Sequence, residues 1–575
     1  MAVCSVTRVA GRARSSVTVP SSDIQIDMFD VGLGASILLQ FRDRDLQPVR
    51  VLADGGAGPG CRSNRVCHAL PSALKDFADG VDRIDLLVGT HYDKDHLSGL
   101  VPVVESGLFE LVEAWLPPVV NDMERLDSTS DPVDTDFLAR QFWDDPSGRR
   151  LLSYLEAKWV EYREAWRLPE TFGRIWDEDA DRPAEPAPQQ RGDDRREEGS
   201  ARPDFGFVED ASNRARIEEL YGFFRKILSE TSEALCIEDD AHADAAYVVD
   251  RHGGTPAEIV SQMPDSTELL KYRAERWWYY QQRPSRYRRL IGALMDGSAL
   301  QKVSDAIQRG SAKDAVNAVH LAELVTALRR RQVPMRCLPI PPGEPLKFVW
   351  DGACGRFVPG PGARPGDICL AILGPSLELV KKHADRLPVG SYALMGLASA
   401  QWSGRVVGVT PSNQLSYVMT LGASGQKILI SGDAGFSDFQ TRPKSKQYYP
   451  DLLAEMSHLD VVQVAHHGGA SGHFYNVLWQ ASSIATPDRY LLLSHAVADK
   501  HRPSREFHDF VELLASSGVA PRILFTSEPQ HELIQRSRRF ANPPVRGHRT
   551  PDASGVVRLA WSAGCWTVQE HAVHV

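Results

Sequence analysis

Four potential metal ligands lie within six residues of one another, in the segment from Thr90 to Gly99. They are two histidines and two aspartates: His91, Asp93, Asp95 and His96. Imidazole nitrogen and carboxylate oxygen together suit zinc, manganese or iron. The alternative is a polar loop that caps a helix, with Asp95 near the start of that helix. Because four ligands so close together rarely serve capping alone, the spacing favours a metal site.

A buried strand is the element that must hold this motif in place. Residues 84–89, Ile-Asp-Leu-Leu-Val-Gly, form an apolar run that predicts a strand ending at Thr90. An earlier apolar run, 49–53, predicts a strand that ends in Asp54 and two glycines. Asp54 could orient a metal ligand from behind, and a turn-forming aspartate is the alternative. Both strands would place polar side chains on loops that a rigid sheet supports.

Three later apolar runs also end in residues that could bind a metal. The predicted strands are 427–430, 460–465 and 490–494. The polar residues that follow them are, in chain order, Asp433, His466, His467 and His501. Each has an ordinary alternative role, as a turn aspartate, a buried histidine or a residue at a helix start. Because strand ends at one edge of a sheet meet, the repeated pattern predicts that these residues share one site with the first motif.

Composition excludes several classes of protein. The chain has 575 residues, 42% of them apolar and 24% charged, so it exceeds one ordinary domain and is otherwise typical of globular protein. Its net charge of −10 argues against uniform binding to nucleic acid or anionic membranes, but is compatible with a local basic patch. The eight cysteines form no CxxC pair, and no apolar run approaches the ~20 residues of a membrane helix. We therefore expect a soluble cytoplasmic protein with reduced thiols and no membrane contact.

The pattern of the sequence divides the chain into four parts. Residues 1–22 predict a disordered lead-in, and residues 23–119 and 336–575 alternate apolar strands with glycine-rich turns. Residues 120–335 carry helical patterns and predict a mainly helical insertion, with a disordered loop at 178–204 that is rich in Asp, Glu, Arg and Pro. We therefore expect one strand-rich domain in two sequence parts, interrupted by helices.

Within the insertion, residues 271–289 interleave basic and aromatic side chains. Nucleic-acid bases could stack on the aromatic rings while the arginines hold phosphates. The alternative is an amphipathic helix with buried rings and solvated arginines, and the acidic chain as a whole favours this alternative. The two expected classes of partner are a nucleic-acid or nucleotide substrate and a protein that binds the insertion.

With these motifs in view, the sequence resembles the metallo-β-lactamase superfamily. Within it the chain is most similar to the soluble branch related to the C-terminal domain of the DNA-uptake protein ComEC. The matching segments follow the family's order: 29–34 (FDVGLG), 53–56 (ADGG), 90–96 (THYDKDH), 413–416 (NQLS), 431–434 (SGDA), 465–468 (AHHG) and 501–504 (HRPS). The resemblance covers about 23–115 and 335–565 and leaves the helical insertion unmatched.

The resemblance implies a four-layer αβ/βα metallo-β-lactamase sandwich with a large, mainly helical insertion. The implied metal ligands are His91, Asp93, Asp95, His96, Asp433, His466 and His501. Asp433 would bridge two ions, and Asp95 and His467 would act in catalysis. We therefore expect one or two divalent ions, zinc or manganese.

The chain departs from the family pattern before the bridging aspartate. The superfamily often supplies a further histidine there, and this chain has Asn413 and Ser416 instead. One metal position is therefore expected to have fewer protein ligands. Asn413 and Asp54 are expected to support the ligands from behind.

The implied activity is that of a metal-dependent hydrolase that uses metal-activated water on phosphodiesters of nucleic acid or nucleotides. One alternative within the same fold is hydrolysis of a lactone, a thioester or another carboxyl derivative. An alternative from another class is a regulatory module that binds a partner and has a secondary metal site. Phosphate-binding side chains near the metal would favour the phosphodiester. The candidates are Arg502, Ser504, Arg536, Arg538 and Arg539.

Overall fold

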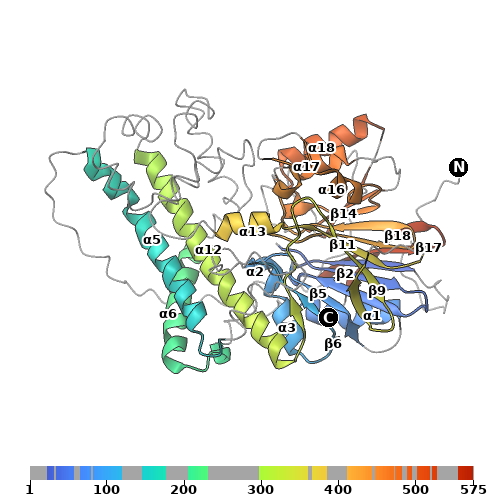
Figure 1. The fold of residues 1–575 in the computed structure, drawn as a ribbon, viewed down its shortest axis with the longest axis horizontal. Coiled ribbons are helices and arrows are strands. Elements are labelled where there is room, and N and C mark those ends of the chain that lie inside the picture. Colours follow the sequence, from blue (N-terminus) through green and yellow to red (C-terminus); the bar gives the residue numbers. More distant parts are fainter. Residues whose placement is uncertain are drawn as a thin grey trace.

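Two large β-sheets and the helices around them make up the computed structural model of the chain. The structure describes residues 23–31, 34–56, 65–78, 82–118, 145–176, 205–230, 297–360, 366–384, 411–442, 447–469, 471, 473–481, 489–494, 502–518, 521–526 and 554–573. The chain is a mixed α/β protein, as its sequence predicts (Figure 1).

The first sheet has eight strands in the order β18-β17-β1-β2-β3-β5-β7-β8. Their bounds are β1 Ile24–Phe29, β2 Ile37–Arg42, β3 Pro48–Ala53, β5 Leu86–Val88, β7 Ala114–Trp115, β8 Met335–Arg336, β17 Ser554–Ser562 and β18 Cys565–Val573. Neighbouring strands are antiparallel from β18 to β3 and parallel from β3 to β8. Two short strands, β4 (Arg83–Ile84) and β6 (Glu110–Leu111), form a separate parallel pair.

The second sheet also has eight strands, in the order β10-β9-β11-β12-β13-β14-β15-β16. Their bounds are β9 Leu346–Asp351, β10 Arg356–Pro359, β11 Cys369–Gly374, β12 Val418–Ala423, β13 Gln426–Ile430, β14 Val461–Gln463, β15 Tyr490–Leu493 and β16 Arg522–Phe525. β12 and β13 form a hairpin, because they pair in antiparallel register on either side of Ser424 and Gly425. From β13 to β16 all neighbours are parallel.

The parallel half of each sheet determines where polar loops gather. Parallel strands that lie side by side end at the same edge of a sheet, so the loops after their carboxyl ends are neighbours. In the first sheet these loops follow β3 and β5, and in the second they follow β13 and β14. The expected metal ligands that the structure describes lie in these four loops or directly after them.

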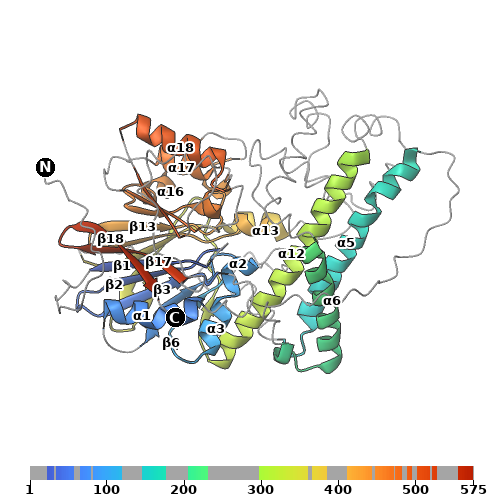
Figure 2. The ribbon, with the colours of Figure 1, turned by 180° about the vertical axis from the view of Figure 1, so that it is seen from behind.

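The two sheets pack face to face around an apolar core. Trp115 of the first sheet is fully buried, and its ring lies 5.0 Å from that of Phe348 on β9. The same core includes Phe474 and Phe507, which lie on helices outside the second sheet. Helices cover both outer faces (Figures 1 and 2): α1 Arg65–Phe77 and α3 Leu100–Glu105 on the first sheet, and α16 Pro450–Glu455, α17 Phe474–Gln480 and α18 Arg505–Ser516 on the second.

Strands from the two ends of the chain are joined inside the first sheet. β1 pairs along its whole length with β17, which lies more than 500 residues later. The guanidinium of Arg558 on β17 forms an ion pair with Asp27 on β1, and both side chains are buried. Arg558 also donates to Asp76 of α1 at 2.8 Å. The ion pair joins residues that lie directly opposite each other in the register of the two strands.

Three long helices form the described part of the insertion: α5 Arg149–Trp176, α6 Ala211–Glu230 and α12 Gly297–Arg330. They pack against one another at one side of the sheets, and α12 also contacts α3 and the short helix α2 (Lys94–Leu97) (Figure 1). Just beyond α12, the guanidinium of Arg331 donates to the carbonyl oxygens of Val104 and Phe109, at 3.0 and 2.7 Å. The described residues between 145 and 330 are thus mainly helical.

Several expectations fall on residues that the structure does not describe. The lead-in at 1–22, the loop at 178–204 and the basic and aromatic segment at 271–289 lie outside the described residues. None of the described helices is long and apolar enough to cross a membrane.

Candidate metal centre

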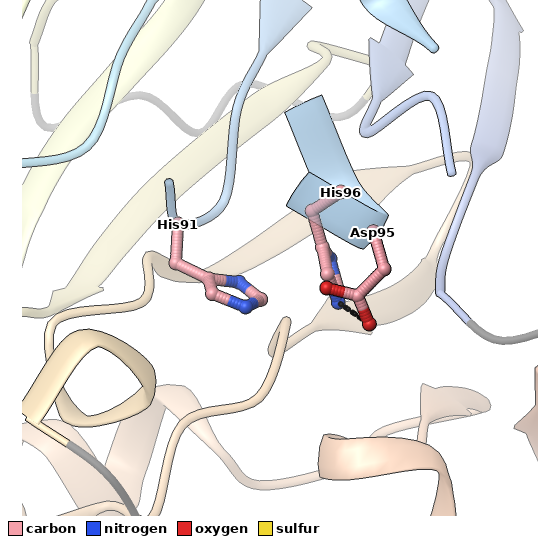
Figure 3. Close-up of side chains that lie close together, drawn as sticks. All are labelled: His91, Asp95 and His96. Carbon is pink, nitrogen blue, oxygen red and sulfur yellow. Dashed lines mark ion pairs between the residues drawn. The ribbon is translucent and has the colours of Figure 1, made fainter. Parts of the chain in front are cut away.

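Loops at the carboxyl ends of parallel strands bring the predicted ligands together. His91 follows β5, and Asp95 and His96 lie in α2, which begins three residues after His91. Asp433 follows β13, and His467 lies in the 3-10 turn η5 (Ala465–Gly468) after β14. Figure 3 shows the side chains of His91, Asp95 and His96 turned toward one another. One edge of the two sheets therefore supplies a shared centre.

Asp433 lies in the middle of this centre. Its Oδ1 is 3.5 Å from Nε2 of His96 and 3.7 Å from Nε2 of His467. Its Oδ2 is 3.9 Å from Nε2 of His91. Oδ2 of Asp95 is 4.0 Å from Nε2 of both His96 and His467. The ligand atoms fall into two groups, His91 with Asp95 and His96, and His96 with Asp433 and His467, and within each group all atoms lie within 4.8 Å.

Four atoms that face the centre are buried and have no hydrogen-bond partner among the described residues. They are Nε2 of His91, His96 and His467, and Oδ1 of Asp433. Leaving a buried polar atom unpaired costs about 1–3 kcal/mol, and folded proteins rarely do so. A divalent cation would satisfy Nε2 of His96 and His467 and Oδ1 of Asp433 at once, because imidazole nitrogen and carboxylate oxygen bind zinc or manganese. The donor set therefore fits the expected metal.

Asp54 holds the first motif from behind. Its Oδ1 accepts a hydrogen bond from the backbone N–H of Thr90, and its Oδ2 accepts one from the Thr90 hydroxyl, both at 2.7 Å. Nδ1 of His96 also lies 2.7 Å from Oδ2 of Asp54. Because Nδ1 is engaged in this contact, Nε2 is the nitrogen of His96 that faces the centre. Asp54 therefore orients His96, as metal-binding proteins commonly orient their histidines.

A turn with unusual backbone angles directs the two adjacent histidines of η5. His466 (φ 52°, ψ 39°) and His467 (φ 54°, ψ 27°) both adopt the left-handed conformation, which is uncommon outside glycine. His467 faces Asp433, whereas Nε2 of His466 lies 2.9 Å from the guanidinium of Arg502. The sequence suggested His466 as a ligand and His467 as a catalytic group. The geometry brings His467 into a ligand group and leaves His466 outside both groups.

Other expected site residues have structural partners. The backbone N–H of Asp433 donates to the hydroxyl of Ser416 at 3.3 Å, and the backbone N–H of Ser416 donates to the carbonyl of Asn413 at 3.1 Å. Ser504 caps α18, because its hydroxyl accepts from the backbone N–H of Phe507. Four expected residues lie outside the described part of the chain: His501, Arg536, Arg538 and Arg539.

Burial and charge together set the protonation of the centre. Burial lowers the pKa of His467 to about 4, against the raising effect of Asp433, and burial also lowers the pKa of His466. Burial acts to lower the pKa of His96 too, but Asp433 and Asp54 outweigh it and hold that pKa well above its usual value. His467 is therefore neutral at pH 7, and a neutral imidazole is the form that binds metals.

The remaining predicted ligand, Asp93, is bound by the helical insertion. Its Oδ2 lies 2.9 Å from Nζ of Lys313, and its Oδ1 accepts from the side-chain amide of Asn317 at 2.7 Å. The carbonyl oxygen of the same amide accepts from the backbone N–H of Lys94 at 2.8 Å, so Asn317 caps the start of α2. Burial raises the pKa of Asp93, but Lys313 and His91 outweigh it and hold the pKa well below its usual value.

Lys313 and Asn317 were not recognised from the sequence. They lie four residues apart on α12 and therefore on one face of that helix. A signal is present, because Asn317 interrupts the apolar run Ala315-Val316-Asn317-Ala318-Val319. A buried polar side chain on an apolar helix face needs a partner elsewhere in the fold.

The chain matches no protein-family model, and comparison with curated proteins found no significant match.

Proposed function

We propose that the chain is a metal-dependent hydrolase that acts on phosphodiesters of nucleic acid or nucleotides. The observation that carries the proposal is the meeting of three buried ligand atoms that have no hydrogen-bond partner among the described residues, Nε2 of His96, Nε2 of His467 and Oδ1 of Asp433. Buried polar atoms without a partner destabilise a fold, and a bound cation would remove this destabilisation by contacting them.

The fold supports placing the chain in the metallo-β-lactamase superfamily as a four-layer αβ/βα sandwich. Two face-to-face sheets with helices on both outer faces agree with that architecture. The ligands lie at the carboxyl edge of the parallel strands, where α/β proteins place their sites. The superfamily assignment itself rests on the sequence motifs, with the helical insertion as an addition to them.

Four residues would hold the ion: Asp95, His96, Asp433 and His467. A bound divalent cation lowers the pKa of water toward neutrality and so supplies a nucleophile for hydrolysis. Zinc and manganese both suit two imidazoles and two carboxylates. Asp95 has the most exposed of these side chains, at 27%, so solvent and substrate reach the centre from its side.

Two cationic side chains near the centre favour a phosphodiester over a carboxyl derivative. The guanidinium of Arg502 contacts His466 beside the ligand His467, and the ammonium of Lys313 contacts Asp93 beside the ligand Asp95. Phosphodiesters carry a negative charge that lactones and thioesters lack, and Arg and Lys are the side chains that bind phosphate oxygens. These positive charges would attract the substrate and stabilise charge that develops during reaction.

Metal analysis combined with a substrate screen tests this proposal. Protein purified without added metal should contain zinc or manganese by mass spectrometry. It should hydrolyse bis(p-nitrophenyl) phosphate faster than p-nitrophenyl acetate or a thioester, and a chelator should stop the reaction. Asp433→Asn should abolish both metal content and turnover.

Asp460→Asn is the matched control, because Asp460 adjoins the opposite end of β14 and accepts from the backbone N–H of Lys427 at 2.8 Å. It should keep both metal and activity. Preference for the acetate or thioester would replace phosphodiesters with carboxyl derivatives. Protein that binds no metal under any condition would refute the hydrolase altogether.

A further inference from the structure

The contact between α12 and Asp93 bears on how many ions the centre holds. Asp93 is 2% exposed, and its two oxygens contact Lys313 and Asn317 at 2.9 and 2.7 Å. A buried carboxylate needs positive charge or hydrogen-bond donors around it, and these two side chains supply both. The positive charge beside Asp93 is therefore the ammonium group of Lys313, which is part of the protein.

The two groups of ligand atoms cannot each hold an ion. Both include His96, and only Nε2 of His96 is available because Nδ1 contacts Asp54. A single nitrogen binds a single ion, so His96 can complete only one of the two groups. Among the described residues, Asp93 belongs to neither group.

Among the described residues, a second position could form around His91. Nε2 of His91 lies 3.6 Å from Oδ2 of Asp93 and 3.9 Å from Oδ2 of Asp433. An ion held by these three residues would bond to the same Asp93 oxygen that contacts Lys313. Two positive charges so close together repel each other strongly in a buried environment. The ammonium of Lys313 therefore excludes a second ion while it remains in place.

We propose that the chain binds one metal ion and that Lys313 supplies the second positive charge of the centre. The inference rests on the proposed function, because it assumes the metal position formed by Asp95, His96, Asp433 and His467. The role of the helical insertion follows: it carries an ammonium group to the place where a second ion would sit. Lys313 is a compact point charge, suited to a phosphate oxygen close to the ion.

The rest of α12 holds Lys313 in position. One turn along the helix, Asn317 bonds to Asp93 and to the backbone of Lys94. The residue next to Lys313, Asp314, forms an ion pair at 2.9 Å with the buried Lys158 of α5. These contacts connect α12 to the metal motif on one side and to α5 on the other. The ammonium is thus held by the fold, although 18% of the Lys313 side chain is exposed.

Counting bound ions tests the inference without measuring activity. The full chain is stripped with chelator, dialysed against manganese or zinc, and analysed for metal per chain by mass spectrometry. Wild type should bind one ion. Lys313→Ala and Lys313→Met should bind two, since Asp93 is released to join His91 and Asp433, and Lys313→Arg should bind one because it keeps the charge. Lys347→Ala is the control, because it removes a lysine that pairs with Glu455 away from the centre, and it should still bind one.

The outcomes separate the two proposals. Wild type with two ions, or Lys313→Ala and Lys313→Met with one, would overturn the role of Lys313 and leave the hydrolase standing. Wild type with no ion would overturn both. Two variants at position 313 are used because Met retains more of the apolar stem than Ala, which protects the packing of α12. Circular dichroism of each variant confirms that stoichiometry is compared between folded proteins.

Discussion

Replacing Asp54 tests whether the orientation of His96 matters for metal binding, because the substitution leaves every proposed ligand in place. Asp54 is fully buried, and its carboxylate makes three contacts of 2.7 Å to Thr90 and His96. Asp54→Asn preserves size and shape, and asparagine tolerates the φ of 60° found here better than most residues. The substitution therefore changes hydrogen bonding and charge with little effect on backbone geometry.

The expected magnitude follows from the donors around Asp54. An asparagine amide has one acceptor and one donor end, whereas all three neighbours present a donor to Asp54 when His96 is neutral. If the amide nitrogen faces His96, Nδ1 of His96 becomes an acceptor and its proton moves to Nε2, which blocks metal binding. If it faces the backbone N–H of Thr90, that hydrogen bond is lost. Metal affinity should fall about 10–100-fold, and the free energy of unfolding should fall by about 1.5–3 kcal/mol.

Calorimetric titration of chelator-stripped protein with manganese measures the affinity, and urea unfolding in chelator measures the stability. Asp85→Asn is the matched control, because Asp85 is a buried carboxylate of the same region that accepts from the backbone N–H of Arg50 at 2.8 Å. It should reduce stability and leave manganese affinity unchanged. Wild-type affinity in Asp54→Asn would refute the reasoning that Asp54 orients His96.

Three further predictions concern activity, packing and pH. Asp95→Ala should reduce phosphodiester hydrolysis on the order of a thousandfold with unchanged thermal unfolding, and full activity would exclude Asp95 from the reaction. Gly99→Ala should lower the melting temperature, since its Cβ would lie 1.9 Å from the carbonyl oxygen of Gly55; a cost of about 1–3 kcal/mol is expected. The pKa of His467, about 4 when folded against 6.5 ordinarily, means that the unfolded chain binds more protons between these values. The stability of metal-free protein is therefore complete above pH 6.5 and falls toward pH 4. At pH 5 this effect lowers the free energy of unfolding of the wild type by about 2 kcal/mol. His467→Asn should abolish this loss, and the same pH dependence of urea unfolding in both proteins would contradict the prediction.

The strands and the ligand positions could be predicted because their signals are local. The apolar runs before His91 and Asp433 are buried strands, and the polar residues after them do meet. Turn residues and apolar runs act over a few positions, so one sequence is sufficient to recognise them. The convergence follows from parallel strands ending at a common edge.

Contacts between distant segments could not be predicted in this way. The bond between Asn317 and Asp93 spans 224 residues, and no local pattern indicates which loop a helix face will meet. The choice between His466 and His467 was also beyond the sequence, because left-handed backbone angles at both residues decide which ring faces Asp433. The pairing of β1 with β17 depends on the whole topology for the same reason.

The pairing of β1 with β17 has a consequence for how the chain folds during synthesis. β1 is synthesised more than 500 residues before β17, and one of its edges stays unpaired until residues 554–562 follow. Until then the carboxylate of Asp27 lacks the guanidinium of Arg558 that it meets in the finished sheet. An unpaired strand edge is a template for association with other chains. Nascent chains halted before Ser554 should therefore depend on chaperones, whereas the completed chain closes its own sheet.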